Sequence, residues 1–258
     1  MPAIACVIPV FNARGELQRA VRSVLGQGDD VQLILVDDAS TDGSADDVRA
    51  LARAEKRIVP LCLSQNRGQS NARNVGVAAA NAPYVTVLDQ DDEHLPGWYA
   101  HAVDALDRHP GYAALKGDLE IVHAGTGEPA VPPGDPRHAT MARSVMWNVV
   151  IRKAVFQAIG GCPTSPVFRT RLGNEDVAFM MALEKHFRFA DSDHLSTRHY
   201  VKPEGATAYF LERTRVSSDG FDFVQHTGPE QDGSLQAALS EFLAFADRNI
   251  EQLRASMR

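Results

Sequence analysis

The stretch Tyr84–Asp92, YVTVLDQDD, decides how the rest of the chain is interpreted. Its first five residues, Tyr84–Leu88, are apolar or β-branched without polar alternation, which is typical of a strand buried on both faces of a sheet. Three carboxylates then follow, those of Asp89, Asp91 and Asp92. Because an unpaired ionised carboxylate is costly to bury, they must emerge at the carboxyl end of the strand. In open α/β sheets that edge forms the crevice in which ligands bind.

Asp89 and Asp91 are alternate residues after this strand, so their carboxylates would point to the same side. Carboxylate oxygens suit a hard cation such as Mg²⁺ or Mn²⁺, and that cation can hold a diphosphate. A second interpretation is an acidic loop that caps a helix starting near Pro96. Capping needs one acid rather than three, so the sequence favours the Mg²⁺ or Mn²⁺ site.

Composition narrows the class of protein. The chain has 258 residues with 44% hydrophobic content, enough for one large α/β domain or two small ones. A net charge of −7 disfavours nucleic acid as a partner. The three cysteines form no CxxC pair, which indicates reduced thiols and a cytoplasmic location. No apolar run is long enough for a membrane span, although a peripheral position at the inner face of a membrane stays open.

The first 95 residues alternate strands with helices. Because each helix is long enough for a crossover, this order predicts a parallel sheet with right-handed connections and helices on both faces. Neither GxGxxG nor GxxxxGK[ST] follows a strand, which argues against a dinucleotide fold and against the P-loop nucleotidases. The expected strands are Ile4–Val10, Val31–Val36, Ile58–Leu63 and Tyr84–Leu88.

The second part of the chain is less regular. Residues 124–138 carry seven glycines and prolines, and we expect this loop to be the most disordered part of the chain. Asn174 is expected to cap a helix that runs to about Lys185. A last amphipathic helix starts at Ser234 and is expected to pack on its own domain or on a twin subunit, so a homodimer is open. Other expected elements are a helix over Pro96–His109, an extended segment over Tyr112–His123, a strand over Trp147–Ile151 and a helix over Lys153–Ile159.

Five motifs together resemble the inverting family 2 glycosyltransferases of the GT-A fold. They are VIPVFN at 7–12, LVDDASTDGS at 35–44, NRGQSNARNVG at 66–76, LDQDD at 88–92 and GNEDVAF at 173–179. Each is weak alone, but five in this order are specific. The resemblance covers roughly residues 4–200. It implies one continuous α/β domain with a mixed central sheet flanked by helices: a Rossmann-like nucleotide-sugar-binding half over 1–95, and an acceptor-binding half with a C-terminal helix over 96–258.

The resemblance implies a nucleotide site at the end of the first two strands. Asp38, rather than Asp37, would accept the imide N–H of uracil, a bond that selects uracil or thymine over cytosine. Phe11 would stack on the base, while Pro9 and Asn12 would line its pocket through the backbone. Packing alone could also explain an aromatic residue at position 11. Asp37 and Asp38 could instead merely lead into a turn.

The resemblance also implies a reaction centre. Arg73 would lie beside the base and diphosphate, Asp89 would reach the ribose or a metal-bound water, and Asp91 would bind the metal. Asp176 would be the general base that takes the proton of the acceptor hydroxyl on the face opposite the leaving diphosphate. Glu175 could exchange roles with Asp176, and both could instead serve as helix-capping acids.

One departure from the resemblance lies at 199–207, HYVKPEGAT. Family members often read Tyr-x-His-Pro-x-Ser there, and the histidine helps to hold the metal and the diphosphate. Lys202 stands in its place; a charged lysine cannot ligate a metal, but it could pair with the β-phosphate. His199 could instead supply the imidazole. In the loop before Asp176, Arg169 or Arg171 could close on the diphosphate or acceptor, or the loop could be a solvated turn.

The sequence therefore predicts a glycosyltransferase that transfers a sugar from a UDP- or dTDP-sugar to a hydroxyl with inversion and with a divalent metal. The acceptor hydroxyl could belong to a saccharide, a lipid-linked glycan, a protein or a small natural product. One alternative is a catalytically inactive nucleotide-binding or scaffold module of a polysaccharide assembly system. Others are a sugar-phosphate nucleotidyltransferase, which would need more glycine after the first strand, and a haloacid-dehalogenase-like phosphatase, which would need its nucleophile there.

Overall fold

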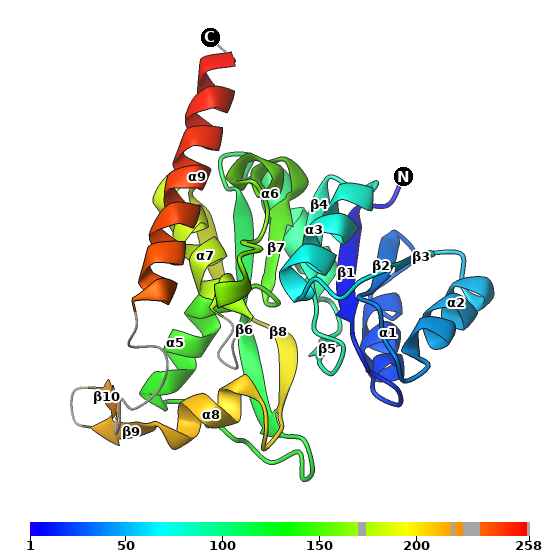
Figure 1. Cartoon of the computed structure of the whole chain (residues 1–258), viewed down its shortest axis with the longest axis horizontal. Coiled ribbons are helices and arrows are strands. Elements are labelled where there is room, and N and C mark those ends of the chain that lie inside the picture. The colour runs from blue at the N-terminus through cyan, green and yellow to red at the C-terminus, as the bar shows by residue number, and fades with distance from the viewer. Residues whose placement is uncertain (170–173, 218–219, 224–232, 257–258) are drawn as a thin grey trace.

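The computed structural model describes residues 1–169, 174–217, 220–223 and 233–256 (Figure 1). Its centre is an eight-stranded mixed sheet with the strand order β3-β2-β1-β4-β7-β6-β8-β5. A separate antiparallel pair, β9 and β10, lies beside the main body, at the lower left of Figure 1. These two strands are Thr214–Ser217 and Gly220–Phe223.

The first four strands form the parallel part of the sheet, as the sequence predicted. β1 lies between β2 and β4, and β3 pairs with the outer edge of β2. All seven residues of β1 are buried, because helices cover both faces of this region. The strands are β1 Ile4–Val10, β2 Val31–Asp37, β3 Ile58–Cys62 and β4 Tyr84–Val87.

The remaining strands make the sheet mixed. β7 pairs antiparallel with both β4 and β6, while β8 runs parallel to β6 and antiparallel to β5. The sheet therefore continues from the four parallel strands into the second part of the chain without a break. These strands are β5 Glu93–His94, β6 Ala114–His123, β7 Val149–Arg152 and β8 Phe189–Val201.

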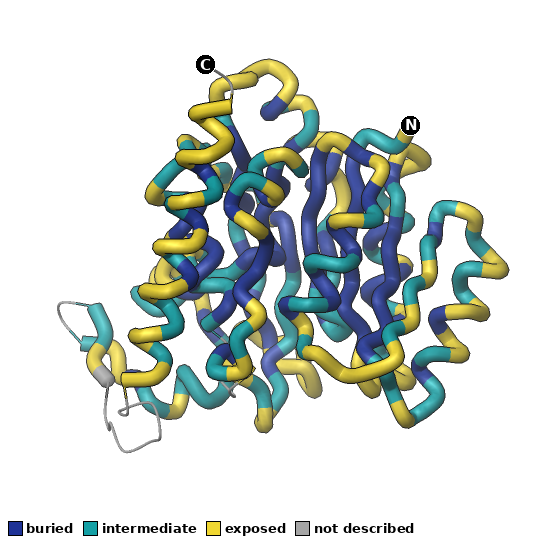
Figure 2. The backbone as a smooth tube through the Cα atoms, turned by 45° about the horizontal axis from the view of Figure 1, so that its top comes forward, coloured by how far each residue is buried: buried dark blue, intermediate teal, exposed yellow. Residues whose placement is uncertain are grey.

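Helices cover both faces of the sheet, and Figure 2 shows the buried strands between partly exposed helices. One apolar core packs α1, α2 and α4 against one face. The other core packs α3, α5, α6, α7 and α9 against the opposite face. The helices are α1 Leu17–Leu25, α2 Ser44–Ala54, α3 Gln69–Ala79, α4 Trp98–Arg108, α5 Pro136–Ser144, α6 Lys153–Ile159, α7 Glu175–His186, α8 Ala206–Glu212 and α9 Ser234–Ser256, with a short 3₁₀ turn at Pro166–Phe168.

Helix α3 approaches the sheet closely because Gly76 has no side chain. A Cβ atom at Gly76 would lie 2.3 Å from a methyl carbon of Val7 on β1 and 3.1 Å from one of Val36 on β2. Real atoms do not approach so closely, so a side chain here would push the helix outward. Gly76 therefore fixes the depth at which α3 carries Arg73 into the centre of the molecule.

Several expectations for the second part of the chain were wrong. Residues 124–138 form turns with a β-bridge between Val122 and Pro129, and α5 begins at Pro136, where Asp135 caps it by accepting from the Arg137 amide. The strand β8 was missed, because its first residues alternate exposed and half-buried and include many polar side chains. The helix predicted after Asn174 is confirmed, because α7 ends at His186, one residue beyond the predicted Lys185. Asn174 is its N-cap residue, in a left-handed conformation with φ of 67°, but its side chain makes no capping hydrogen bond.

Helix α9 packs on its own domain, one of the two outcomes predicted. Its buried residues Phe242, Ala246 and Ile250 belong to the same core as α6 and α7. Asp247 adds an ion pair with Lys185 of α7 at 2.8 Å. None of the helices in the described part of the chain combines the length and apolar character that a bilayer span requires.

Candidate active site

A cavity of about 690 Å³ opens at the carboxyl ends of β1 and β4. Its walls come from both parts of the sequence: the end of β1, the loops at 66–70 and 89–91, the segment 144–147, the loop at 163–169, the start of α7 and the segment 199–207. The structure thus brings together most of the predicted site residues. Those that line the cavity are Pro9, Phe11, Asp38, Asp89, Asp91, Asp176, His199 and Lys202.

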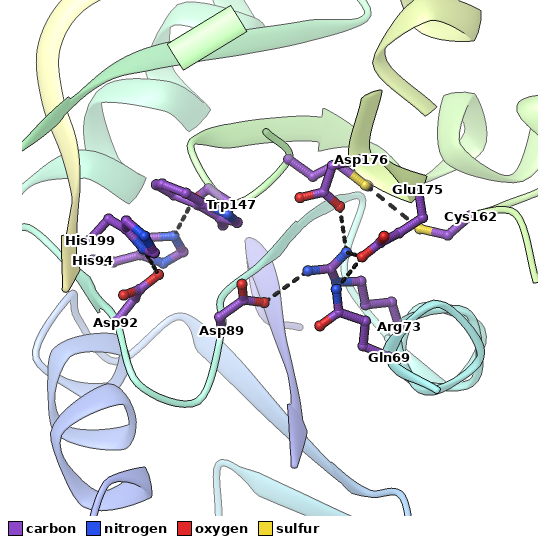
Figure 3. Close-up of polar contacts among 11 residues, drawn as sticks. Gln69, Arg73, Asp89, Asp92, His94, Trp147, Cys162, Glu175, Asp176 and His199 are labelled. Carbon is purple, nitrogen blue, oxygen red and sulfur yellow. Dashed lines mark hydrogen bonds and ion pairs between the residues drawn. The ribbon is translucent and has the colours of Figure 1, made fainter. Parts of the chain in front are cut away.

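A buried ion cluster, which we call the Arg73 cluster, lies below the cavity (Figure 3). The Arg73 side chain is 0% exposed. Its Nη2 lies 2.8 Å from Asp89 Oδ1, while its Nη1 lies 2.5 Å from Asp176 Oδ1 and 3.3 Å from Glu175 Oε1. A buried guanidinium needs such partners because an unpaired buried charge is strongly destabilising. One side chain from α3 therefore joins the loop after β4 to the start of α7.

Asp176 and Glu175 differ in access to the cavity. The Asp176 side chain is 16% exposed, whereas Glu175 is 3% exposed and also accepts a hydrogen bond from the Gln69 amide. Burial raises the pKa of Asp176 above the ordinary aspartate range; Arg73 opposes this shift, and the charges of Glu175 and Asp89 add to it. Asp176 is thus the more accessible acid of this pair, and its pKa is raised to about 7.

Phe11 also lines the cavity, and it is 43% exposed. Its backbone is held by one side chain: the Phe11 amide donates to Gln90 Oε1 at 2.8 Å, and Gln90 Nε2 donates to the Phe11 carbonyl at 3.1 Å. An exposed ring on a fixed backbone is suited to stacking on a planar ligand. Asn12 does not belong to the cavity lining; its Oδ1 accepts from the Thr41 amide at 2.9 Å and so supports the turn behind Phe11.

Asp38 is 2% exposed and lies at the edge of the cavity. Its carboxylate accepts from the Arg67 amide at 2.9 Å and from the Gly68 amide at 2.7 Å. The predicted uracil acceptor therefore also holds the turn before α3. Gly68 has φ of +85°, and a Cβ atom there would lie 3.0 Å from Arg169 Nε, so this turn also contacts the loop that precedes α7.

A second group of charges, which we call the Lys202 cluster, lies at the cavity wall. Lys202 Nζ is 2.7 Å from Asp91 Oδ2 and 2.7 Å from Glu16 Oε2, and its side chain is 26% exposed. Burial lowers the pKa of Lys202, but the hydrogen bonds to Asp91 and Glu16 outweigh burial, so the pKa is raised. The lysine is therefore charged and is fixed between two carboxylates.

His199, which lines the cavity, forms a separate pair with the buried Asp92 (Figure 3). His199 Nδ1 lies 2.8 Å from Asp92 Oδ2, its Nε2 lies 2.8 Å from Thr207 Oγ1, and its ring stacks on Trp147. Burial raises the pKa of Asp92 to about 6 against the opposing charge of His199. Both ring nitrogens are thus engaged, and Asp92 is fully buried, so neither residue is placed as the metal ligand that the sequence left open.

The residues around Asp91 do not fit a divalent cation. No group of three His, Cys, Asp or Glu side chains able to hold a metal occurs in the described ranges. Asp89 is paired with Arg73, and Asp91 with Lys202. A divalent ion about 4 Å from the ammonium would be repelled by about 8 kcal/mol at an effective dielectric constant of 20. The Mg²⁺ or Mn²⁺ site stays a prediction, and this geometry does not support it.

Sequence reasoning missed three residues that shape the site. Sequence reasoning assigned no role in the site to Glu16, Gln69 or Gln90, which contact Lys202, Glu175 and Phe11 respectively. Nothing in their spacing indicates these contacts, because each partner lies more than 75 residues away. Arg171 lies outside the described residues, so its predicted contact with the diphosphate stays a prediction.

Comparison with known proteins agrees with this geometry. Residues 5–131 match the model of the family described as glycosyl transferase family 2. The chain is 37% identical over 93 residues to the putative teichuronic acid biosynthesis glycosyltransferase TuaG of Bacillus subtilis, covering 36% of this chain and 37% of TuaG. It is 32% identical over 128 residues to the GalNAc(5)-diNAcBac-PP-undecaprenol beta-1,3-glucosyltransferase of Campylobacter jejuni, covering 48% of this chain and 40% of that protein.

The curated relatives are longer than the region they share: the matches span 28% to 40% of their length. Among solved structures, S. aureus TarS 1-349 in complex with UDP-GlcNAc aligns with a TM-score of 0.66 and 17% identity, covering 96% of this chain and 70% of that one. Identity this low shows the fold alone. Residues 5–131 therefore belong to glycosyl transferase family 2, and the chain as a whole has the GT-A fold.

Proposed function

We propose that the protein transfers a sugar from a UDP- or dTDP-sugar to an acceptor hydroxyl with inversion at the anomeric carbon. The observation that carries this proposal is the Arg73 cluster: a single buried guanidinium bonds Asp89 on the nucleotide-binding side and Asp176 on the other side of the same cavity. A donor-side acid and a reachable base thus share one cavity. This is what a single displacement between a bound donor and a bound acceptor requires.

The donor would occupy the part of the cavity formed by the ends of β1 and β4. Phe11 offers a ring face to the base, and Asp38 lies at the cavity edge within the same wall. Asp38 already accepts two backbone amides, and a carboxylate has acceptor capacity left beyond these for an imide N–H. Uracil and thymine carry that N–H and cytosine does not, which supports a UDP- or dTDP-sugar.

Asp176 is proposed as the general base. In the transfer, the acceptor oxygen forms a bond to the anomeric carbon as the bond to the diphosphate oxygen breaks, and the hydroxyl proton passes to the Asp176 carboxylate. Both acids line the cavity, but Asp176 suits this role better than Glu175 because its side chain is the more exposed of the two. Arg73 orients Asp176 and favours its ionised form.

For the acceptor, we propose only a chemical class. One relative is named for a glycan linked to PP-undecaprenol, and another for teichuronic acid biosynthesis. These names support a saccharide or lipid-linked glycan over a protein or a small natural product, and they fit a cytoplasmic or membrane-peripheral location. A divalent metal was part of the sequence prediction and stays untested, but the pairing of Asp91 with Lys202 argues against it.

Two measurements test this proposal. The first is calorimetric titration of UDP, dTDP, GDP and CDP into the full chain; UDP and dTDP should bind at least tenfold more tightly than CDP. The second is turnover of UDP-sugars with saccharide and lipid-linked acceptors, with the product anomer read by NMR. Asp176→Asn should bind UDP normally but lose at least about a thousandfold in turnover, while the control Asp104→Asn on the outside of α4 should behave as wild type.

The alternatives predict other results. Selective UDP binding without turnover on any acceptor would favour an inactive nucleotide-binding module. Formation of a nucleotide sugar from a sugar phosphate and a nucleoside triphosphate would favour a nucleotidyltransferase. Failure to bind any of the four nucleotides would contradict the proposed function altogether.

A further inference from the structure

Lys202 is held as a fixed cation rather than as a flexible surface lysine. Its two carboxylate partners come from different elements: Glu16 immediately precedes α1, and Asp91 lies in the loop after β4. The Asp91 carbonyl also accepts from Arg19 Nη2, so the loop is fixed from the side of α1 as well. Two partners on separate elements restrict the ammonium to one position.

The ammonium still has donor capacity for a ligand. An ammonium group has three N–H donors, and the contacts of Lys202 with Glu16 and Asp91 use two. The side chain is 26% exposed and belongs to the cavity lining, next to Asp91. A third N–H can therefore serve an oxygen in the cavity while both carboxylates stay bound.

The other cations in or near the cavity do not occupy the position of Lys202. Arg73 is fully buried and is not part of the cavity lining, because its guanidinium faces three carboxylates. Arg67 and Arg169, the other basic lining residues in the described ranges apart from His199, belong to the turn and loop beside Asp38. Among the basic residues that line the cavity in the described ranges, Lys202 is the one paired with the Asp91 carboxylate.

We propose that the Lys202 ammonium takes the place of a divalent cation at the donor diphosphate, so that donor binding and transfer need no metal. This inference rests on the proposed function and deepens it. The third N–H of Lys202 donates to an oxygen of the β-phosphate. Asp91 and Glu16 act as positioning residues for the ammonium rather than as metal ligands.

The charges in the reaction then balance without a metal. The bond between the anomeric carbon and the β-phosphate oxygen breaks, and its electron pair leaves with the nucleoside diphosphate. The Lys202 ammonium stabilises the new negative charge and keeps its own proton. The acceptor oxygen supplies the electron pair for the new bond, and its proton goes to Asp176.

The test is calorimetric titration of UDP into the full chain, once with EDTA and once with MnCl₂. The wild type should bind UDP in EDTA with an affinity within threefold of that in Mn²⁺. Lys202→Ala should bind at least tenfold more weakly in EDTA. Mn²⁺ should restore part of that loss, because the variant leaves Asp91 unpaired and removes the repelling ammonium. Lys202→Arg keeps the charge and should lose less than Lys202→Ala.

Lys185→Ala is the matched control, since it removes a lysine that is also ion-paired to an aspartate but lies on the outer side of α7. It should bind UDP as wild type in both conditions. Thermal unfolding of each variant separates lost binding from lost folding.

The outcomes are distinguishable. Wild-type binding that disappears in EDTA and returns with Mn²⁺ would overturn the role of Lys202 while leaving the glycosyltransferase proposal intact. Folded Lys202→Ala protein that binds UDP as wild type in EDTA would overturn it as well. Absence of binding to UDP and to dTDP under both conditions would contradict the proposed function itself.

Discussion

The Arg73 cluster and the Lys202 cluster each take one acid from the loop after β4, but they differ in depth. Arg73 is 0% exposed and faces Asp89, Glu175 and Asp176, whereas Lys202 is 26% exposed and faces Asp91 and Glu16. A cation without access to the cavity can only orient its partners. A cation at the cavity wall can also contact a ligand. Two acids separated by one residue thus serve architecture in one case and, in our proposal, ligand recognition in the other.

The largest effect is expected for Arg73→Met. The substitution leaves three carboxylates without their buried partner, so the free energy of unfolding should fall by about 3–5 kcal/mol. Lys202→Ala should cost about 1 kcal/mol or less, since a partly exposed pair contributes little. Urea unfolding of the two variants measures both values. Equal losses would contradict the distinction between the clusters.

The pH dependence of turnover tests the Arg73 cluster without a mutation. Asp176 must be ionised to accept a proton, and its pKa is raised by burial. Activity should therefore be present above that pKa and fall about tenfold per pH unit below it, with the fall beginning above the ordinary aspartate range near 4. The profile of kcat against pH measures this. A profile flat down to pH 4.5 would exclude Asp176 as a base with a raised pKa.

Gln90 lies between Asp89 of the Arg73 cluster and Asp91 of the Lys202 cluster, and its side chain links the loop after β4 to Phe11. Gln90→Ala removes both hydrogen bonds to the Phe11 backbone, so the ring should lose its fixed position. We expect KM for the donor to rise about tenfold with kcat changed less than about twofold, since two neutral hydrogen bonds contribute about 1 kcal/mol each at most. Gln69→Ala, which loosens Glu175 instead, serves as the contrasting variant. A larger effect on kcat than on KM in Gln90→Ala would place Gln90 in the reaction itself.

The smallest effect is expected for Glu16→Gln. The amide still accepts a hydrogen bond from Lys202 but no longer attracts its charge, so the ammonium should be held less firmly. Affinity for UDP in EDTA should change by about two- to fivefold, and unfolding should be almost unaffected. Loss of binding comparable to that of Lys202→Ala would show that Glu16 contacts the ligand directly.

The sequence predicted the first half of the fold well for a physical reason. Strands such as Ile4–Val10 are buried on both faces, and their apolar runs end in acids that mark the carboxyl edge of the sheet. The second half carries no such signal. Strand β8 begins with alternating polar residues, and helix α5 follows a loop rich in glycine and proline. There the pairing partners, rather than the local sequence, decide the structure.

The residues of the site could be predicted from the sequence, but the contacts between them could not. Resemblance placed Arg73, Asp89 and Asp176 in one centre, and the structure brings them within hydrogen-bonding distance. The pairing of Lys202 with Asp91 depends on two segments 111 positions apart in the numbering, and no local pattern records it. The DXD-like spacing predicted a metal because it considers the acids alone. The sequence could not show that Asp89 is paired with Arg73 and Asp91 with Lys202.

The contacts of Arg73 also bear on how the chain is synthesised. Its partners Glu175 and Asp176 lie 102 and 103 residues further along the chain, whereas Asp89 lies only 16 residues away. Because a growing chain folds from its amino terminus, the parallel strands can pair on the ribosome while the guanidinium still has only Asp89 as a partner. The burial of Arg73 is then completed when α7 docks. Closure of the buried cluster and placement of the proposed base are thus one late event, so under the proposed function the nucleotide site forms earlier than the complete reaction centre.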